Sequence, residues 1–203
     1  MYRFVLILFI FISGSLFSQS EEWYSCDDCE YGKIAYKIID PFNFIVTAKV
    51  RIDANISTVF SVVTDLNTYP KWIYNVYQVD LIENRGDYAG LYYMLIEAPF
   101  PLNDIDATME YEVKSDTSNN SFSLVQSCIP FYYDFRGDFQ RVTRYKAIWK
   151  FRPMNENTTE LIYIVKLGGP ENLPGFLLKV FLCQSPTKTI ENLNSICSQS
   201  ADN

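Results

Sequence analysis

The feature that most constrains this chain is a long series of strand-like segments between residues 76 and 167. Apolar and polar side chains alternate along these segments, which is the period of a β-strand with one buried face. In residues 107–115, Met109, Tyr111 and Val113 fall on one face, and charged residues lie between them. Because short turns separate the segments, the sequence predicts an antiparallel sheet whose apolar face must be covered by another layer.

Residues 175–196 are the natural covering layer. They follow the break at Gly168-Gly169-Pro170 and carry apolar side chains at helical spacing. Pro174 can open this helix, and Pro186 is expected to kink or divide it. The pattern therefore predicts an α+β domain in which one long C-terminal helix packs against a strongly curved sheet.

Two strands and a short helix precede this series. Asn55, Ser57 or Thr58 can cap the helix, and Tyr69-Pro70 is expected to end it. The predicted strands are residues 33–39, 44–52, 76–83, 88–97, 107–115, 122–128, 141–152 and 161–167.

The first residues are typical of an export signal. Arg3 precedes the apolar run 4–12, and small residues follow up to Ser18. The run is too short for the ~20 residues that span a bilayer, so cleavage after Ser18 is favoured over retention as an anchor. We therefore expect an exported protein, periplasmic or secreted, that is divided as follows: signal peptide 1–18, N-terminal segment 19–33, main domain 34–197 and polar tail 198–203.

The charge of the chain limits its partners. Without Arg3, 16 Lys and Arg residues face 24 Asp and Glu residues. An acidic surface repels phosphate backbones, so nucleic acid is excluded as a partner. Anionic membranes are disfavoured for the same reason, although an apolar patch is compatible with transient membrane contact. The sequence specifies no oligomeric state.

The five cysteines suit an exported protein, in which disulfides persist. Cys26 and Cys29 form a C-x-x-C motif without the βαβ context of a redox site. Histidine is absent, which excludes most zinc sites, and no metal is expected. The motif predicts either a local Cys26–Cys29 disulfide or bonds that tie the N-terminal segment to the body.

The chain also has few groups suited to catalysis. The absence of histidine removes Ser-His-Asp and Cys-His chemistry. Glu97, Asp104 and Asp106 are the only plausible carboxylate cluster, and aspartates in a loop more often stabilise a turn. We expect no cofactor and no enzymatic activity.

Four motifs resemble those of the START domains, a family of helix-grip lipid-binding modules. The resemblance covers about residues 34–197, and the order and spacing of the motifs support it. Residues 99–106, Pro-Phe-Pro-Leu-Asn-Asp-Ile-Asp, are similar to the family's Pro-Trp-Pro-Leu-Ser-Asp-Arg-Asp signature. The other matches are Tyr69-Pro70-Lys71-Trp72, Arg141-Val142 with Trp149 and Pro153, and Gly168-Gly169 with Leu173-Pro174.

This resemblance implies a helix-grip (START/Bet v1-like) fold with a hydrophobic tunnel beneath the C-terminal helix. The tunnel would hold a lipid or another hydrophobic small molecule. The family's signature arginine is replaced by Ile105, so a buried ion pair made by that arginine would be missing and a less polar ligand is conceivable.

The alternating faces indicate which side chains line such a tunnel. A closed space of ~300 Å³ or more along them would favour binding. The candidates are Trp72, Met94, Ile96, Tyr111, Phe122, Leu124, Tyr145, Trp149, Tyr163 and Val165, with Phe176, Leu177, Val180 and Phe181 in the roof.

Two other functions compete with ligand binding. A cyclase-type or aromatase-type enzyme would place a carboxylate or a tyrosine in the cavity. An interaction module would have a solid core and would use the aromatic loop of residues 129–139, namely Phe131, Tyr132, Tyr133, Phe135 and Phe139.

Overall fold

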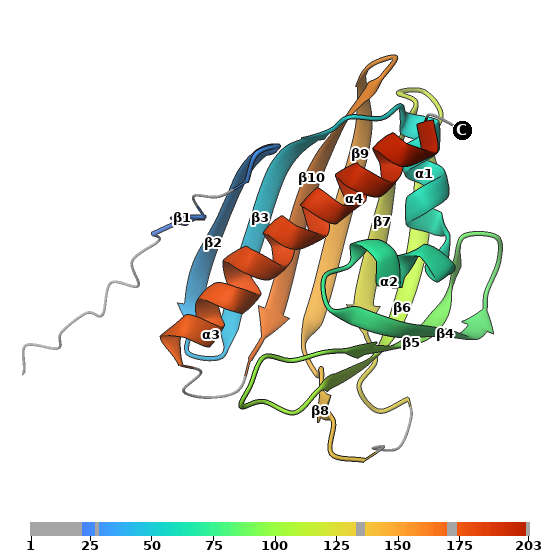
Figure 1. The fold of residues 1–203 in the computed structure, drawn as a ribbon. Coiled ribbons are helices and arrows are strands. Elements are labelled where there is room, and N and C mark those ends of the chain that lie inside the picture. Colours follow the sequence, from blue (N-terminus) through green and yellow to red (C-terminus); the bar gives the residue numbers. More distant parts are fainter. Residues whose placement is uncertain (1–21, 27–28, 133–136, 170–173, 202–203) are drawn as a thin grey trace, which may run out of the picture.

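One strongly curved sheet wraps around a long C-terminal helix in the computed structural model of this chain (Figure 1). The structure describes residues 22–26, 29–132, 137–169 and 174–201. The expected signal peptide, residues 1–18, lies outside these ranges. Within them, no helix combines the length and the apolar character needed to cross a bilayer.

The strands form the predicted antiparallel sheet. Its members are β1 (Tyr24–Cys26), β2 (Gly32–Asp40), β3 (Asn43–Ile52), β4 (Val76–Asn84), β5 (Ala89–Ile96), β6 (Ile105–Asp116), β7 (Ser121–Cys128), β8 (Gln140–Arg141), β9 (Tyr145–Asn155) and β10 (Thr158–Gly168). They are ordered β1-β2-β3-β10-β9-β7-β6-β5-β4, and β8 pairs with β6 in parallel. This is the predicted α+β helix-grip arrangement.

Two strand predictions need correction. Residues 141–152 were expected to form one strand, but Arg141 belongs to the short β8 and β9 begins only at Tyr145. The second correction is β1, an unpredicted strand that pairs with the edge of β2 through three residues. Such a short edge strand has too few residues for a clear alternation.

The first helical region consists of three pieces, namely α1 (Ile56–Thr64), a 3₁₀ turn (Leu66–Thr68) and α2 (Tyr69–Trp72). Asn55 caps α1, because its side-chain oxygen accepts a hydrogen bond of 2.9 Å from the backbone N–H of Thr58. The expected end at Tyr69-Pro70 is wrong. The proline lies in the first turn of α2, where its missing N–H costs nothing.

The C-terminal helix runs without interruption through α3 (Gly175–Lys179), the π-helical turn η2 (Val180–Gln184) and α4 (Ser185–Ala201). The expected division at Pro186 does not occur, and a π-helical turn ends at Gln184, two residues before the proline. The backbone N–H of Ser185 bonds to the carbonyl of Val180, five residues back. The wider turn lets the helix continue where Pro186 has no N–H to donate.

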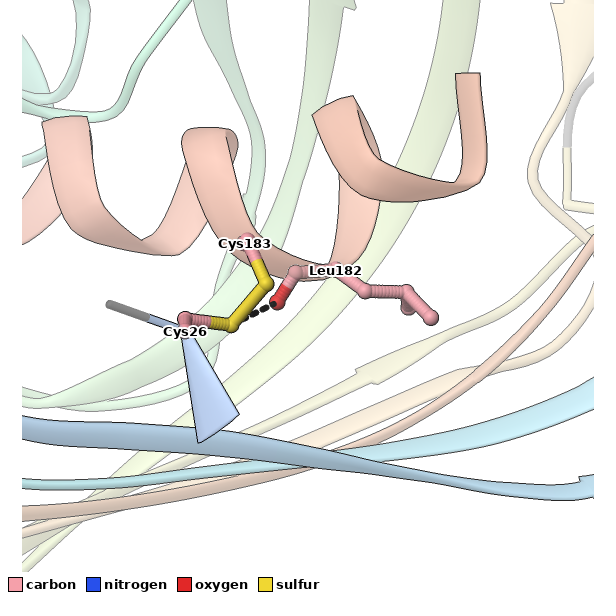
Figure 2. Close-up of a disulfide and its surroundings, with 3 residues drawn as sticks. All are labelled: Cys26, Leu182 and Cys183. Carbon is pink, nitrogen blue, oxygen red and sulfur yellow. Dashed lines mark hydrogen bonds between the residues drawn. A yellow bond between two sulfur atoms is a disulfide. The ribbon is translucent and has the colours of Figure 1, made fainter. Parts of the chain in front are cut away.

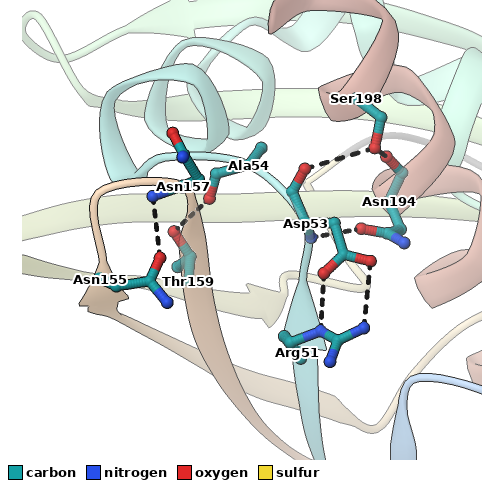
Figure 3. A network of polar contacts seen from close by, with 8 residues as sticks. All are labelled: Arg51, Asp53, Ala54, Asn155, Asn157, Thr159, Asn194 and Ser198. Atoms are coloured by element: carbon teal, nitrogen blue, oxygen red, sulfur yellow. Dashed lines mark hydrogen bonds and ion pairs between the residues drawn. The ribbon is translucent and has the colours of Figure 1, made fainter.

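Polar contacts fix the α4 end of this helix to the sheet (Figure 3). The backbone N–H of Asp53 donates a 2.7 Å hydrogen bond to Oδ1 of Asn194, and the Ser198 hydroxyl donates to the carbonyl of Asp53. Next to them, the Thr159 hydroxyl donates to the carbonyl of Ala54. This network closes one end of the molecule, because backbone groups at the end of β3 find their partners on α4.

Candidate functional site

A cavity of about 240 Å³ lies between the C-terminal helix and the concave face of the sheet. Its floor comes from β5, β9 and β10, and its roof from Leu178 of α3, from η2 and from the first turn of α4. The connections 73–76 and 97–105 form its sides. The volume is below the ~300 Å³ that typical ligand pockets reach.

Many of the predicted side chains do line this cavity. They come from alternate positions of three strands and from the π-helical turn, so they share one surface. They are Met94, Ile96, Tyr145, Trp149, Tyr163, Val165, Val180 and Phe181.

Four predicted residues on the concave side lie outside the cavity, namely Trp72, Tyr111, Phe122 and Leu124. Helix α1 fills the space above this part of the sheet. Phe60 of α1 packs edge-on against Phe122 at 4.9 Å between ring centroids. The core is therefore solid here, and these side chains stabilise packing instead of facing an open space.

The roof prediction is wrong for Phe176 and Leu177. Phe176 is 62% exposed, and Leu177 is buried without lining the cavity. The π-helical turn lies between these residues and α4, and it shifts the angular position of everything before it. A continuous 3.6-residue period across this region therefore assigns the wrong face to the start of the helix.

Several residues that line the cavity were not among the predicted ones. Tyr92 could have been found, because it shares the alternation of Met94 and Ile96 on β5. Gln126 carried no such signal, since a glutamine on an inward face breaks the apolar pattern. Other missed residues are Phe44, Ile73, Tyr74, Val76, Met109, Val142, Leu167, Leu178, Leu182 and Pro186.

Gln126 is the centre of one polar contact in the cavity wall. Its amide nitrogen donates a 2.7 Å hydrogen bond to the Tyr92 hydroxyl, and its amide oxygen accepts one of 3.0 Å from the indole N–H of Trp149. Burial raises the pKa of Tyr92 well above its usual value. These groups use one another as partners, which is how buried polar side chains are tolerated.

A second polar contact joins Tyr145 and Tyr163, whose hydroxyl oxygens are 3.4 Å apart. Both line the cavity. The Tyr163 ring also packs against the indole of Trp149, with 4.1 Å between centroids. Burial raises the pKa of both phenols, so they are neutral at physiological pH.

Asp106 does not face the cavity. It forms a buried ion pair with Arg141, in which Nε of Arg141 lies 3.0 Å from Oδ1 of Asp106. The Tyr93 hydroxyl donates to the same carboxylate, and Arg141 also donates to the carbonyl of Pro130. The pair links β6 to β8 on the side of the sheet away from the helix. A buried ion pair is thus present despite Ile105, which itself lines the cavity.

The other two candidate carboxylates lie at the rim. Asp104 accepts hydrogen bonds from the backbone N–H of Ala98 at 3.1 Å and from the Tyr77 hydroxyl at 3.3 Å, so it stabilises the turn. Glu97 lines the cavity but is exposed. The expected carboxylate cluster of Glu97, Asp104 and Asp106 is therefore divided between the rim and the far face of the sheet.

Arg144 lies on the opposite side of the rim and is exposed. Its Nη2 donates a 3.3 Å hydrogen bond to the carbonyl of Gly169, and its guanidinium lies over the ring of Phe42. A Cβ atom on Gly168 would approach Nε of Arg144 to 2.4 Å. The glycine therefore allows the arginine to cross the end of β10.

One disulfide ties the N-terminal segment to the roof (Figure 2). It joins Cys26 at the end of β1 to Cys183 in η2. The Cys26 sulfur lies 3.7 Å from the carbonyl oxygen of Leu182, a contact without a hydrogen because both sulfurs are bonded. The predicted Cys26–Cys29 bond is wrong, and the alternative of a bond to the body is confirmed.

The remaining cysteines are reduced. Cys29 and Cys128 are half-buried, and Cys197 is buried in α4. Among the residues that the structure describes, no group of acidic and cysteine side chains is arranged to hold a metal ion.

The aromatic loop of residues 129–139 is only partly described, and Tyr133 and Phe135 lie outside the described residues. Phe131 is 82% exposed, and Phe139 is half-buried. The Tyr132 hydroxyl donates to Glu83 on β4 at 3.2 Å. Phe131 is therefore the described aromatic side chain of this loop that is most available to a partner.

The fold and the cavity can be compared with known proteins. A STAR-related lipid transfer protein from Xanthomonas axonopodis is 21% identical, with a TM-score of 0.75 over 87% of this chain and 99% of that chain. Human StAR-related lipid transfer protein 5 is 16% identical, with a TM-score of 0.74 over 91% of this chain and 90% of that chain. An uncharacterised protein from Pseudomonas aeruginosa is 22% identical over 71% of this chain and 70% of its own length.

These solved structures share the START-like helix-grip fold. The sequence itself matches a family model over residues 52–194, which is more than half of the chain. The family is described as polyketide cyclase / dehydrase and lipid transport. The matched range begins at the last residue of β3 and ends within α4, so it includes most of the cavity wall. The chain therefore belongs to the polyketide cyclase / dehydrase and lipid transport family.

Proposed function

We propose that this protein binds a lipid or another hydrophobic small molecule in its cavity, outside the cytoplasm and without covalent chemistry. The observation that carries the proposal is the cavity beneath the helix, with a wall of mainly apolar and aromatic side chains. Such a wall favours an apolar ligand over water, because burial of apolar surface is the main gain in free energy. The lipid transfer proteins of the same fold support this choice.

The size of the cavity limits the ligand. At about 240 Å³, it lies below the ~300–1,000 Å³ of pockets that enclose drug-sized ligands. A lipid with two long acyl chains exceeds this volume unless the roof moves. A small ring system or a single short chain fits the cavity as it stands.

Several observations favour binding over catalysis. The chain has no histidine, and Asp106 is neutralised by Arg141 on the far side of the sheet. The raised pKa values of Tyr145 and Tyr163 make these phenols poor proton donors and poor bases at neutral pH. The cyclase part of the family description supports the enzymatic alternative, which predicts a change in the mass of a bound ligand over time.

The Cys26–Cys183 bond supports the export part of the proposal. Disulfides persist in oxidising compartments and are rare in the cytosol. Fractionation of producing cells, with intact-mass measurement of the exported chain, tests both the location and cleavage after Ser18. A full-length chain found only in the cytosol would contradict this part.

Native mass spectrometry of freshly purified protein, followed by solvent extraction, tests ligand binding directly. We expect a bound mass that is released on denaturation. Val165→Phe places a larger side chain on the cavity floor and should remove the bound mass. Ile164→Phe is the matched control, because the neighbouring side chain points to the other face of the same strand and should leave binding intact.

A protein without bound mass that also fails to bind fluorescent hydrophobic probes would refute the proposal. It would favour the interaction module, which the exposure of Phe131 supports. In that case Phe131→Ala should abolish association with a partner. Transient membrane contact stays a prediction, and flotation with neutral and anionic vesicles checks it.

A further inference from the structure

The polar groups of the cavity wall differ in how completely they are satisfied. The Gln126 amide donates a hydrogen bond to the Tyr92 hydroxyl oxygen and accepts one from the indole N–H of Trp149. The pair Tyr145–Tyr163 has only a mutual contact of 3.4 Å, which is long for two hydroxyls. Among the side-chain hydrogen bonds of the described wall residues, this one is the longest, so an incoming polar group can improve on it most.

The Tyr145–Tyr163 pair carries one hydroxyl hydrogen more than its mutual contact can use. Two phenols carry two hydroxyl hydrogens, and one of them at most serves the mutual bond. In the part of the chain that the structure describes, neither hydroxyl bonds to any other group. One donor is therefore left for a ligand. A buried donor without an acceptor is costly, so a ligand that supplies one gains affinity.

The charge of the surroundings selects the kind of acceptor. Both phenols are neutral, since burial raises their pKa. Among the described residues, Glu97 and Arg144 are the charged ones of the cavity wall, and both are exposed at the rim. An ionised group beside the tyrosines would be buried without a counter-charge, which is strongly unfavourable. A carbonyl or a hydroxyl avoids this cost.

We infer that the Tyr145–Tyr163 pair is a polar subsite for one neutral hydrogen-bond acceptor, a ketone, ester or hydroxyl oxygen, on an otherwise apolar ligand. The inference rests on the proposed function and narrows its ligand class. It excludes fatty-acid carboxylates from this position and excludes pure hydrocarbons as the best ligands. The remaining cavity, lined by Met94, Trp149, Val165 and Phe181, holds the apolar part.

Three probes of nearly the same shape test the subsite: 2-acetylnaphthalene, 2-ethylnaphthalene and 2-naphthoate. Displacement of a neutral fluorescent dye gives their affinities for the full chain. We expect 2-acetylnaphthalene to bind about five- to tenfold more tightly than 2-ethylnaphthalene, the range that one neutral hydrogen bond supplies. We expect 2-naphthoate to bind at least about tenfold more weakly than the ketone.

The key variant is the double substitution Tyr145→Phe/Tyr163→Phe. Either single substitution leaves one hydroxyl whose hydrogen is then available, so each should keep part of the preference for the ketone. The double variant should bind the ketone and the hydrocarbon with equal affinity, while its affinity for 2-ethylnaphthalene stays near that of the original protein. Tyr92→Phe tests the competing phenol of the wall, because Gln126 donates to the Tyr92 oxygen and the Tyr92 hydroxyl hydrogen could also serve a ligand. A subsite at the Tyr145–Tyr163 pair requires that this variant keep the preference.

The outcomes separate the subsite from the proposed function. Binding of 2-ethylnaphthalene without a preference for the ketone refutes the subsite and leaves the hydrophobic cavity standing. Tightest binding of 2-naphthoate also refutes it and points to Arg144 at the rim. Loss of the preference in Tyr92→Phe but not in the double variant assigns the donor to the Tyr92 hydroxyl and refutes the subsite at the Tyr145–Tyr163 pair. If no probe binds, both proposals fail.

Discussion

The two halves of the C-terminal helix cover the same sheet by different means. Helix α4 packs against α1, α2 and β3, and its side chains Ile190 and Leu193 are fully buried. Asn194 and Ser198 add hydrogen bonds to the backbone of Asp53. The other half, α3 with η2, lies over the cavity and is joined to the N-terminal segment by the Cys26–Cys183 bond.

This difference shows where the molecule can open. Local stability follows the number of buried apolar contacts and satisfied polar groups, and both are concentrated on α4. A cavity beneath α3 and η2 removes contacts from that half, so its amides should exchange with solvent before those of α4. The segment of the helix over the cavity is thus expected to be the less stable of the two.

The largest expected effect is the loss of core packing in α4. Leu193→Ala should lower the free energy of unfolding by about 2–5 kcal/mol, because the side chain is fully buried. Val180→Ala in η2 should cost about 1 kcal/mol or less, since one side of Val180 faces the cavity. Urea denaturation of both variants measures the contrast, and equal losses would show that the two halves are packed alike.

Removal of the disulfide should come next. The double substitution Cys26→Ser/Cys183→Ser should cost about 2–4 kcal/mol, which is the typical contribution of a disulfide. Hydrogen exchange should rise in α3 and η2 more than in α4. Cys29→Ser is the control and should change neither quantity, since Cys29 is not bonded. Uniform loosening of the whole helix would contradict the comparison.

A smaller effect is expected at the polar anchor of α4. Asn194→Ala leaves the backbone N–H of Asp53 without its acceptor and should cost about 1–3 kcal/mol. Gln184→Ala replaces an exposed residue of η2 and should stay within about 0.5 kcal/mol. Thermal unfolding at neutral pH measures both variants. A loss at Gln184 as large as that at Asn194 would mean that η2 has an anchor of its own.

The smallest effect concerns pH. Burial raises the pKa of the Cys197 thiol from 9.0 to about 12. Above pH 9 the unfolded chain loses this proton and the folded chain keeps it, so stability falls as pH rises toward 12. Between pH 8.5 and 10 the loss should be about 1 kcal/mol.

Buried tyrosines contribute with the same sign, so the test is the difference between the original protein and Cys197→Ala. We expect a shallower decline in the variant over that range. Identical slopes in urea unfolding would show that the thiol is not protected by α4.

Local patterns allowed much of the fold to be predicted. The alternation of apolar and polar residues predicted most strands, and helical spacing predicted the C-terminal helix. Asn55 was among the predicted caps of the first helix. These features depend on residues that are close together in the sequence. The resemblance to START domains predicted the cavity beneath that helix. The alternation also places several lining side chains on the inward face of their strands, namely Met94, Tyr145, Trp149 and Tyr163.

The rest depends on groups far apart in the sequence. Nothing near Cys26 indicates that its partner is Cys183, and nothing near Asp106 indicates Arg141. The exposure of Phe176 follows from the π-helical turn, where one extra residue turns the preceding helix by about 100°. Such effects follow from the three-dimensional packing, which periodicity does not describe.

The Cys26–Cys183 bond also sets the route of mechanical load. β1 pairs with β2 through three residues only, and Cys26 is the last of them. A force on the N-terminal segment is therefore transmitted through the disulfide to η2 before it acts on the hydrogen bonds between β2 and β3. Any attachment of the N-terminal residues to another structure would act on the roof of the cavity rather than on its floor.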